Sequence, residues 1–152
     1  NEFKLDVFNE KFDFIIAQSI FSHTGIDIVE KSVERFSEQL TTGGIALITF
    51  VNGLTDTTEE GWIYPKCVEF KKKTIIKKAK KNHLYCKKLN WHHPRQSWFI
   101  FSKDKKTIPN LFQSHMLRGT VLFDTELKTN FKLKLKRKIK QYLNKYFRKH
   151  ND

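Results

Sequence analysis

The stretch FDFIIAQSIFSH, residues 12–23, decides how the rest of the sequence is interpreted. Its first half is apolar without regular polar alternation, which is typical of a strand covered on both faces inside an α/β sheet. Its second half becomes polar at Gln18 and Ser19 and reaches His23. We therefore predict a buried strand over residues 12–17 that runs into a polar loop.

Strands and helices alternate after this stretch. Apolar residues with a spacing close to 3.6 predict an amphipathic helix over residues 27–40, and the TTGG segment (41–44) predicts that this helix stops with a left-handed glycine. A second strand covered on both faces is predicted next. The remaining predicted elements are strand 45–51, a short basic helix 71–82, strand 84–91, the loop HHPRQ (92–96) and strand 97–102.

This order of elements indicates an α/β fold. Two strands joined by a helix are expected to lie parallel with a right-handed crossover. The last two strands are joined by a few residues, so they are expected to pair antiparallel unless another strand comes between them. The predicted sheet is therefore mostly parallel, has one antiparallel strand and is flanked by helices.

Composition limits the possible function classes without choosing among them. The 152 residues suffice for about one domain. A net charge of +13 is compatible with binding to nucleic acid or an anionic membrane. Only five of the 29 basic residues are arginine, however, which favours general amino-acid bias over a binding surface as the origin of the charge. Cys67 and Cys86 match no metal spacing, and no signal or membrane-spanning pattern is found, which favours a reduced, cytoplasmic protein.

The C-terminal third differs from the rest. Residues 104–126 are interpreted as a linker or irregular segment, and residues 127–150 as a basic amphipathic helix with apolar residues spaced by four. Alternation in FKLKLK (131–136) leaves a strand open for its first turns. A helix over 127–149 could bind RNA, DNA or an anionic membrane. It could equally pack against a partner subunit.

Three motifs, taken in order, resemble a known family. KFDFIIAQSIFSH (11–23), LTTGGIALITF (40–50) and the closing strand–loop–strand resemble the C-terminal half of a class I S-adenosylmethionine-dependent methyltransferase of the small-molecule branch. The resemblance covers about residues 1–103. It implies a partial Rossmann-like sheet that supplies strands 4-5-7-6 of the family order 3-2-1-4-5-7-6, with the seventh strand antiparallel.

The sequence also departs from this family. It contains no G-x-G, so the glycine-rich cofactor loop is absent, as is the acidic residue that would hold the ribose. The resemblance therefore implies a piece of a longer protein that is inactive alone. Its first strand would be an open edge. The expected partner is the missing N-terminal half of the domain, and the open edge could also support an oligomer.

The resemblance places the cofactor beyond the end of the opening strand, where the strand order switches. Gln18 and Ser19 are predicted to hydrogen-bond S-adenosylmethionine there, and Phe21 to give it an apolar wall. His23 is a candidate catalytic base. Alternatively, Ser22, His23 and Thr24 only satisfy the first amides of the following helix.

Two further loops are expected at the same edge of the sheet. Trp62 and Tyr64 are predicted to contact a small-molecule or sugar-type substrate as an aromatic lid, although Trp62 could be ordinary core. His92 and Arg95 are predicted to bind substrate, and His93 is a second candidate base. No metal site is expected from the adjacent histidines, because neighbouring residues rarely point at one ion.

Overall fold

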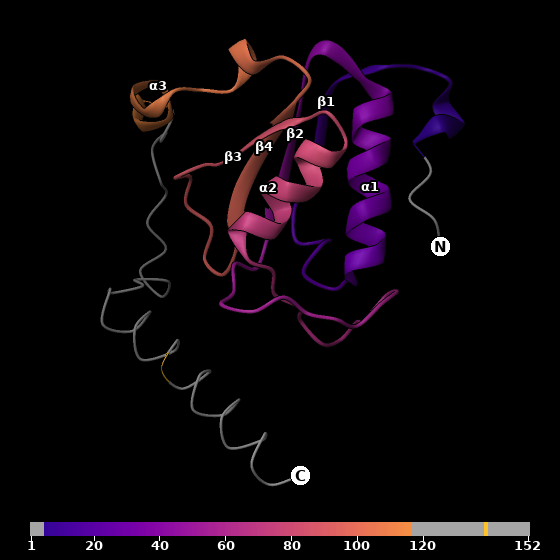
Figure 1. Ribbon diagram of the computed structural model, residues 1–152, viewed down its shortest axis with the longest axis vertical. Helices are drawn as coiled ribbons and strands as arrows, with labels where there is room; N and C mark the ends of the chain where they lie inside the picture. Colours follow the sequence, from indigo (N-terminus) through magenta and orange to yellow (C-terminus); the bar gives the residue numbers. More distant parts are fainter. Residues whose placement is uncertain (1–4, 117–138, 140–152) are drawn as a thin grey trace, which may run out of the picture. The chain divides into compact units, whose positions relative to one another are not determined.

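The computed structural model describes residues 5–116 and residue 139 (Figure 1). The chain divides into two units, residues 1–119 and 120–152, and the fold below is that of the first. The basic helix predicted over residues 127–150 lies outside the described residues, apart from position 139. Residues 104–126, predicted as a linker, begin with two short helical segments.

Strands and helices alternate as the sequence predicts. The main elements are β1 (Phe12–Ala17), α1 (Ile26–Gln39), β2 (Leu40–Phe50), α2 (Lys72–Lys81), β3 (Tyr85–Lys88) and β4 (Ser97–Ser102). Single helical turns are η1 (Asp6–Phe8) and η2 (Lys105–Thr107), and a short helix α3 spans Leu111–Met116. β1 and β4 have the predicted bounds, whereas β2 is longer and β3 shorter than predicted.

The four strands form one sheet in the order β1-β2-β4-β3. β1 and β2 are parallel, and β4 runs antiparallel to both β2 and β3. This is the predicted α/β fold: a partial Rossmann-like sheet in which the last strand is inserted beside the second. β1, β2 and β3 therefore point the same way, and their carboxyl ends meet at one edge of the sheet.

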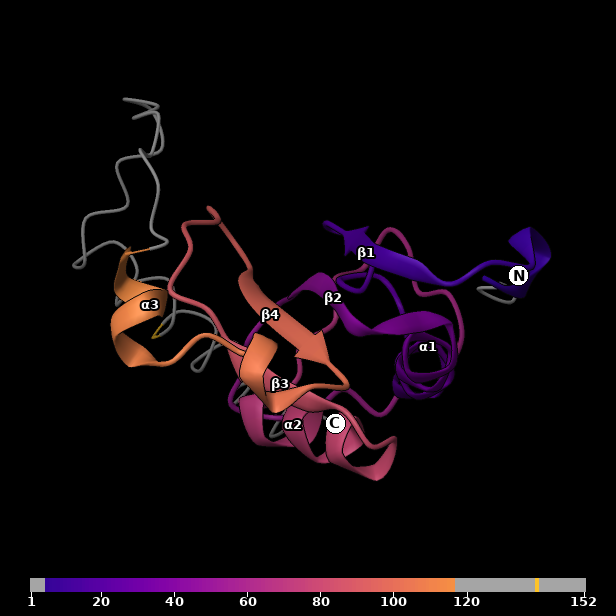
Figure 2. The same ribbon diagram turned by 90° about the horizontal axis from the view of Figure 1, so that it is seen from above.

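Both long helices cover the same face of the sheet, as Figure 2 shows from above. α1 buries Val33 and Phe36, and α2 buries Ile75 and Ala79. Phe50 lies at the centre of this core, where its ring contacts four other phenylalanines. Burying large aromatic rings contributes much of the folding energy of a domain this size.

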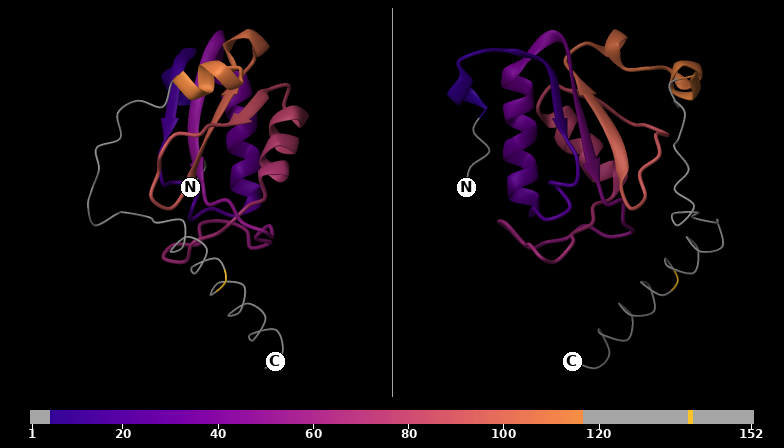
Figure 3. Two further views of the ribbon diagram at one scale, coloured as in Figure 1. Left: turned by 90° about the vertical axis from the view of Figure 1, so that its left-hand side faces the viewer. Right: turned by 180° about the vertical axis from the view of Figure 1, so that it is seen from behind.

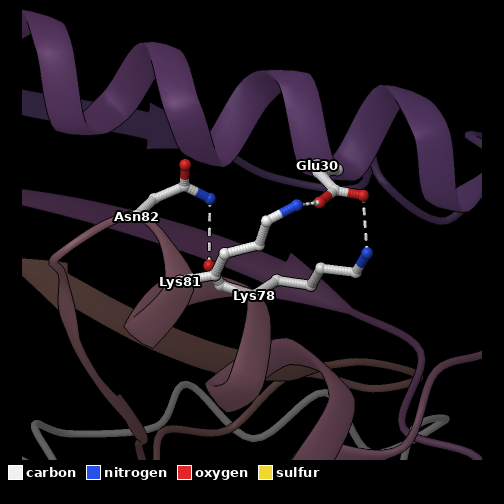
Figure 4. Close-up of polar contacts among 4 residues, drawn as sticks. All are labelled: Glu30, Lys78, Lys81 and Asn82. Atoms are coloured by element: carbon white, nitrogen blue, oxygen red, sulfur yellow. Dashed lines mark hydrogen bonds and ion pairs between the residues drawn. The ribbon is translucent and has the colours of Figure 1, made fainter.

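An ion-pair cluster joins the two helices (Figure 4). The Glu30 carboxylate accepts hydrogen bonds from Lys78 Nζ and Lys81 Nζ, each at 2.6 Å. Asn82 Nδ2 donates to the Lys78 carbonyl at 3.0 Å and closes the end of α2. Hydrogen bonds from Lys78 and then Lys81 lower the pKa of Glu30. The cluster therefore fixes α1 beside α2 at their exposed sides.

The predicted left-handed glycine stop after α1 is wrong. The helix ends at Leu40 in an extended conformation (φ −69°, ψ 141°), and β2 begins there at once. Gly44 lies inside β2 next to an irregularity in the register with β1. A Cβ at Gly44 would lie 2.8 Å from the Phe12 carbonyl oxygen. The glycine therefore serves the close approach of two strands rather than the end of a helix.

The prediction that β1 is covered on both faces is also wrong. Phe14 and Ile16 are 69% and 66% exposed, and they pair in register with Ile45 and Leu47 of β2 on the face away from α1 and α2. Figure 3 shows both helices on one side of the strands. No described residue buries Phe14 or Ile16, so the apolar pattern of β1 extends over one covered and one exposed face.

Candidate functional site

Three loops follow the parallel strands and meet at the carboxyl edge of the sheet. They are residues 18–25 after β1, 51–71 after β2 and 89–96 after β3. The residues predicted to bind cofactor or substrate all fall in these loops. The predicted convergence follows directly from the observed strand directions.

Ser19 lies at the end of β1 in an unusual conformation. Its φ is +61°, a left-handed value that is uncommon for a residue with a side chain. Its N–H donates to Thr49 Oγ1 at 2.7 Å, and its Oγ accepts from Gln96 Nε2 at 3.1 Å. Ser19 is therefore held between β2 and the loop after β3, with the exposed Gln18 beside it.

Phe21 does not form an open wall at this edge. It is 1% exposed, and its ring lies 6.2 Å from that of Phe36 and 5.5 Å from that of Phe50. The chain turns inward after Ile20, so Phe21 enters the core beneath α1. Phe21 is therefore a core residue, and its role is structural rather than the predicted contact with the cofactor.

Trp62 and Tyr64 stand outside the core. They are 54% and 66% exposed, whereas Ile63 between them packs against the core. The Ile63 N–H donates to the His23 carbonyl at 2.7 Å, and the Gly25 N–H donates to the Gly61 carbonyl at 2.7 Å. The alternative that Trp62 is core is wrong, and the pair lies directly against the loop after β1.

The alternative in which Ser22, His23 and Thr24 cap helix α1 is also wrong. The N-cap is Gly25, with no side-chain cap hydrogen bond. Ser22 Oγ donates back to the Ser19 carbonyl at 3.0 Å, and His23 Nδ1 lies 2.8 Å from the Lys66 carbonyl oxygen. Because a carbonyl only accepts, Nδ1 is the donor in this contact, and in the neutral tautomer that fits it the lone pair lies on Nε2.

His93 has the opposite arrangement. Its Nδ1 accepts from the Gln96 N–H at 3.0 Å and from the Arg95 N–H at 3.3 Å. Partial burial, and to a lesser extent the neighbouring His92, lower the pKa of His93. The neutral ring therefore carries its proton on Nε2, where it can donate a hydrogen bond, while the lone pair on Nδ1 is occupied and not available to take a proton. Of the two candidate bases, His23 has the suitable tautomer; His92 and Arg95 are exposed.

Two residues that hold the site together were not singled out by the sequence. Thr49 is fully buried and receives the Ser19 N–H, and Gln96 joins the loops after β1 and β3. Thr49 is the one polar residue within IALITFV (45–51). A polar residue in an apolar strand could have indicated that its side chain has a buried hydrogen-bond partner. Gln96 gave no signal, because its partner lies 77 residues away.

Within residues 5–116 and at residue 139, no three His, Cys, Asp or Glu side chains are placed to hold a metal ion. The same described residues contain no helix long and apolar enough to cross a membrane.

No protein-family model and no curated protein match this chain. Among solved structures, an O-methyltransferase family protein from Burkholderia thailandensis is similar at 13% identity and a TM-score of 0.48, over 66% of this chain and 33% of that chain. TehB from Haemophilus influenzae is similar at 13% identity and a TM-score of 0.42, over 67% of this chain and 40% of that chain. The chain thus spans less than half the length of either. Similarity at this level describes overall shape, and function has to be inferred from the residues of the chain itself.

Proposed function

We propose that this chain is the C-terminal part of an S-adenosylmethionine-dependent methyltransferase that acts on a small-molecule or sugar-type acceptor. The observation that carries the proposal is the strand order β1-β2-β4-β3 with β4 alone reversed. That order and direction match the 4-5-7-6 half of the sheet that the motifs imply. Polar and aromatic side chains gather at the carboxyl edge, where ligands bind in such sheets.

The residues at this edge fit one side of a cofactor pocket. The exposed Gln18 side chain and the hydroxyl proton of Ser19 offer hydrogen-bonding groups at the end of β1, while the Ser19 N–H is bonded to Thr49. When bound, S-adenosylmethionine supplies a methyl group that is already electrophilic. The protein then has to align the acceptor and remove a proton. We assign proton removal to His23 Nε2 and exclusion of water to Trp62 and Tyr64.

The other side of the pocket is proposed to come from an N-terminal half of the same domain. β1 is an edge strand, and an uncovered edge presents unpaired backbone N–H and C=O groups. Phe14 and Ile16 add an exposed apolar face beside that edge. A further parallel strand next to β1 would pair the backbone groups of this edge, and a helix over the apolar face would cover Phe14 and Ile16. We place the complete enzyme in the cytoplasm as part of the same proposal.

The first test is calorimetric titration of S-adenosylmethionine into two proteins: this chain, and the same chain preceded by the residues encoded upstream of Asn1. We expect binding by the longer protein only, because the chain alone lacks half of the pocket. Binding by the short chain would contradict a split pocket. If the longer protein binds no cofactor, the likeness to methyltransferases is one of fold alone.

A matched pair of variants tests the role of the exposed face. In the longer protein, Phe14→Lys with Ile16→Lys should abolish cofactor binding, because a covered face cannot accept two charges. Leu111→Lys is the control, since Leu111 is 83% exposed on α3. Equal binding by both variants would show that nothing covers Phe14 and Ile16. If a second copy of the chain covers this edge, size-exclusion chromatography should show that the short chain is a dimer.

A further inference from the structure

Three aromatic rings form an exposed cluster beside the N-terminus of α1. The His23 ring lies 5.2 Å from that of Tyr64 and 6.3 Å from that of Trp62. The Trp62 and Tyr64 side chains are 54% and 66% exposed. Exposed tryptophan and tyrosine side chains that gather in one place are typical of binding surfaces. We call these three residues the aromatic platform.

The aromatic platform is held in place by the backbone. Ile63, which lies between Trp62 and Tyr64 in the sequence, packs its side chain against the core. The His23 ring is fixed by its hydrogen bond to the Lys66 carbonyl, and the Lys66 N–H in turn donates to the Ile63 carbonyl at 3.0 Å. Rings that are ordered before a ligand arrives lose little entropy on binding. The backbone of the platform and the His23 ring are therefore fixed before a ligand arrives.

Carboxylates lie in the turn that leads into the platform, although the whole chain carries a net charge of +13. Glu59 and Glu60 are exposed and directly precede Gly61. The Gly61 N–H donates to Asp27 Oδ1 at 2.9 Å, which brings a third carboxylate to the same turn. Lys66 offsets one of these charges through a loose ion pair with Glu59 at 3.8 Å. This turn therefore carries three carboxylates, of which Lys66 pairs with one.

We propose that the aromatic platform binds the alkylammonium group of a small-molecule ligand. Aromatic faces attract cations through their negative π-electron density, and tryptophan is the strongest such partner. Nearby carboxylates add Coulomb attraction and disfavour anionic ligands. The platform shares His23, Trp62 and Tyr64 with the proposed methyl-transfer site, but the inference rests on the rings and the carboxylates alone, because it requires neither cofactor nor a second half of the domain. The platform and the carboxylates all lie within the described chain.

The test uses NMR of the full chain, whose three tryptophans each give one indole N–H signal. Comparison with Trp62→Phe identifies the Trp62 signal. Choline chloride is the probe, and the controls are sodium chloride at equal ionic strength and the neutral choline isostere in which tert-butyl replaces trimethylammonium. We expect the Trp62 signal alone to shift saturably with choline. The isostere should bind about fivefold more weakly, the ratio given by a cation–π term of about 1 kcal/mol.

Variants separate the ring from the charge. Tyr64→Phe keeps an aromatic face and should retain binding, whereas Tyr64→Leu should weaken it severalfold. Glu60→Gln should weaken choline binding and leave the isostere unchanged. These side chains are exposed, so circular dichroism should show an intact fold. Equal shifts with choline and its isostere, shifts of all three tryptophans together, or no saturation would each overturn the proposal.

Discussion

Replacement of Phe21 by alanine distinguishes a core residue from a ligand contact. Phe21 is 1% exposed and its ring contacts Phe36 and Phe50. Removing a buried phenylalanine side chain costs about 3–5 kcal/mol, because its apolar contacts are lost and a cavity remains. A domain of this size is stable by about 5–15 kcal/mol in total. We therefore expect Phe21→Ala to lower the urea midpoint by more than about 1 M or to leave the chain unfolded.

Two further variants make the result interpretable. Phe21→Leu keeps most of the volume and should cost about 1–2 kcal/mol. Phe14→Ala removes the same atoms from a side chain that is 69% exposed, and should change stability by less than about 0.5 kcal/mol. Urea unfolding followed by circular dichroism measures all three. If Phe21→Ala costs no more than Phe14→Ala, Phe21 is not core, and it is then available to contact a ligand.

Three other predictions concern charge, backbone and thiol chemistry. Hydrogen bonds from the two lysines hold the pKa of Glu30 below its usual 4.5 in the folded state. Its ion pairs therefore stabilise the fold above pH 4.5, and this stabilisation is lost as the pH falls through the lowered pKa. The stability difference between wild type and Glu30→Gln, measured by thermal unfolding, should shrink in acid. Gly25→Ala would place a Cβ 2.5 Å from a carbonyl oxygen of the loop after β2, so it should cost about 1–3 kcal/mol and speed proteolysis of that loop. Burial raises the pKa of Cys86 to about 12, so in the native protein iodoacetamide should label the exposed Cys67 much faster than the partly buried Cys86. Equal labelling of both thiols before unfolding would contradict this shielding of Cys86.

Most of the fold could be predicted because the strands are short apolar runs and the helices have an apolar spacing close to 3.6. The bounds of β1 and β4 and the reversal of β4 followed from residue pattern and connection length. The end of α1 could not be predicted in the same way. A glycine pair after a helix is equally compatible with a left-handed cap and with close strand packing. At Gly44 the close approach of the Phe12 carbonyl decides between the two. Phe12 is distant in the sequence, so a local residue pattern cannot show this approach.

The candidate site was predictable only at the level of loops. Strand directions alone bring the three loops to one edge, whereas side-chain pairing within them depends on long-range contacts. Ser19 and Gln96 are far apart in the sequence, and the tautomer of His93 depends on which backbone amides reach its ring. The exposure of Trp62 likewise follows from Ile63 taking the inward position of the same segment.

The uncovered face of β1 and the polar loop at its end both lie at the edge of the sheet. β1 is the edge of the sheet, so the element that covers Phe14 and Ile16 would also stand beside Ser19. Under the proposed function, covering that face and binding the cofactor therefore draw on the same contact. Linkage then requires that S-adenosylmethionine raise the affinity between the two halves by the same factor by which the N-terminal half raises the affinity for the cofactor. With the halves prepared separately, equality of these two factors is expected, and a cofactor that leaves their association unchanged would show that the pocket does not span them.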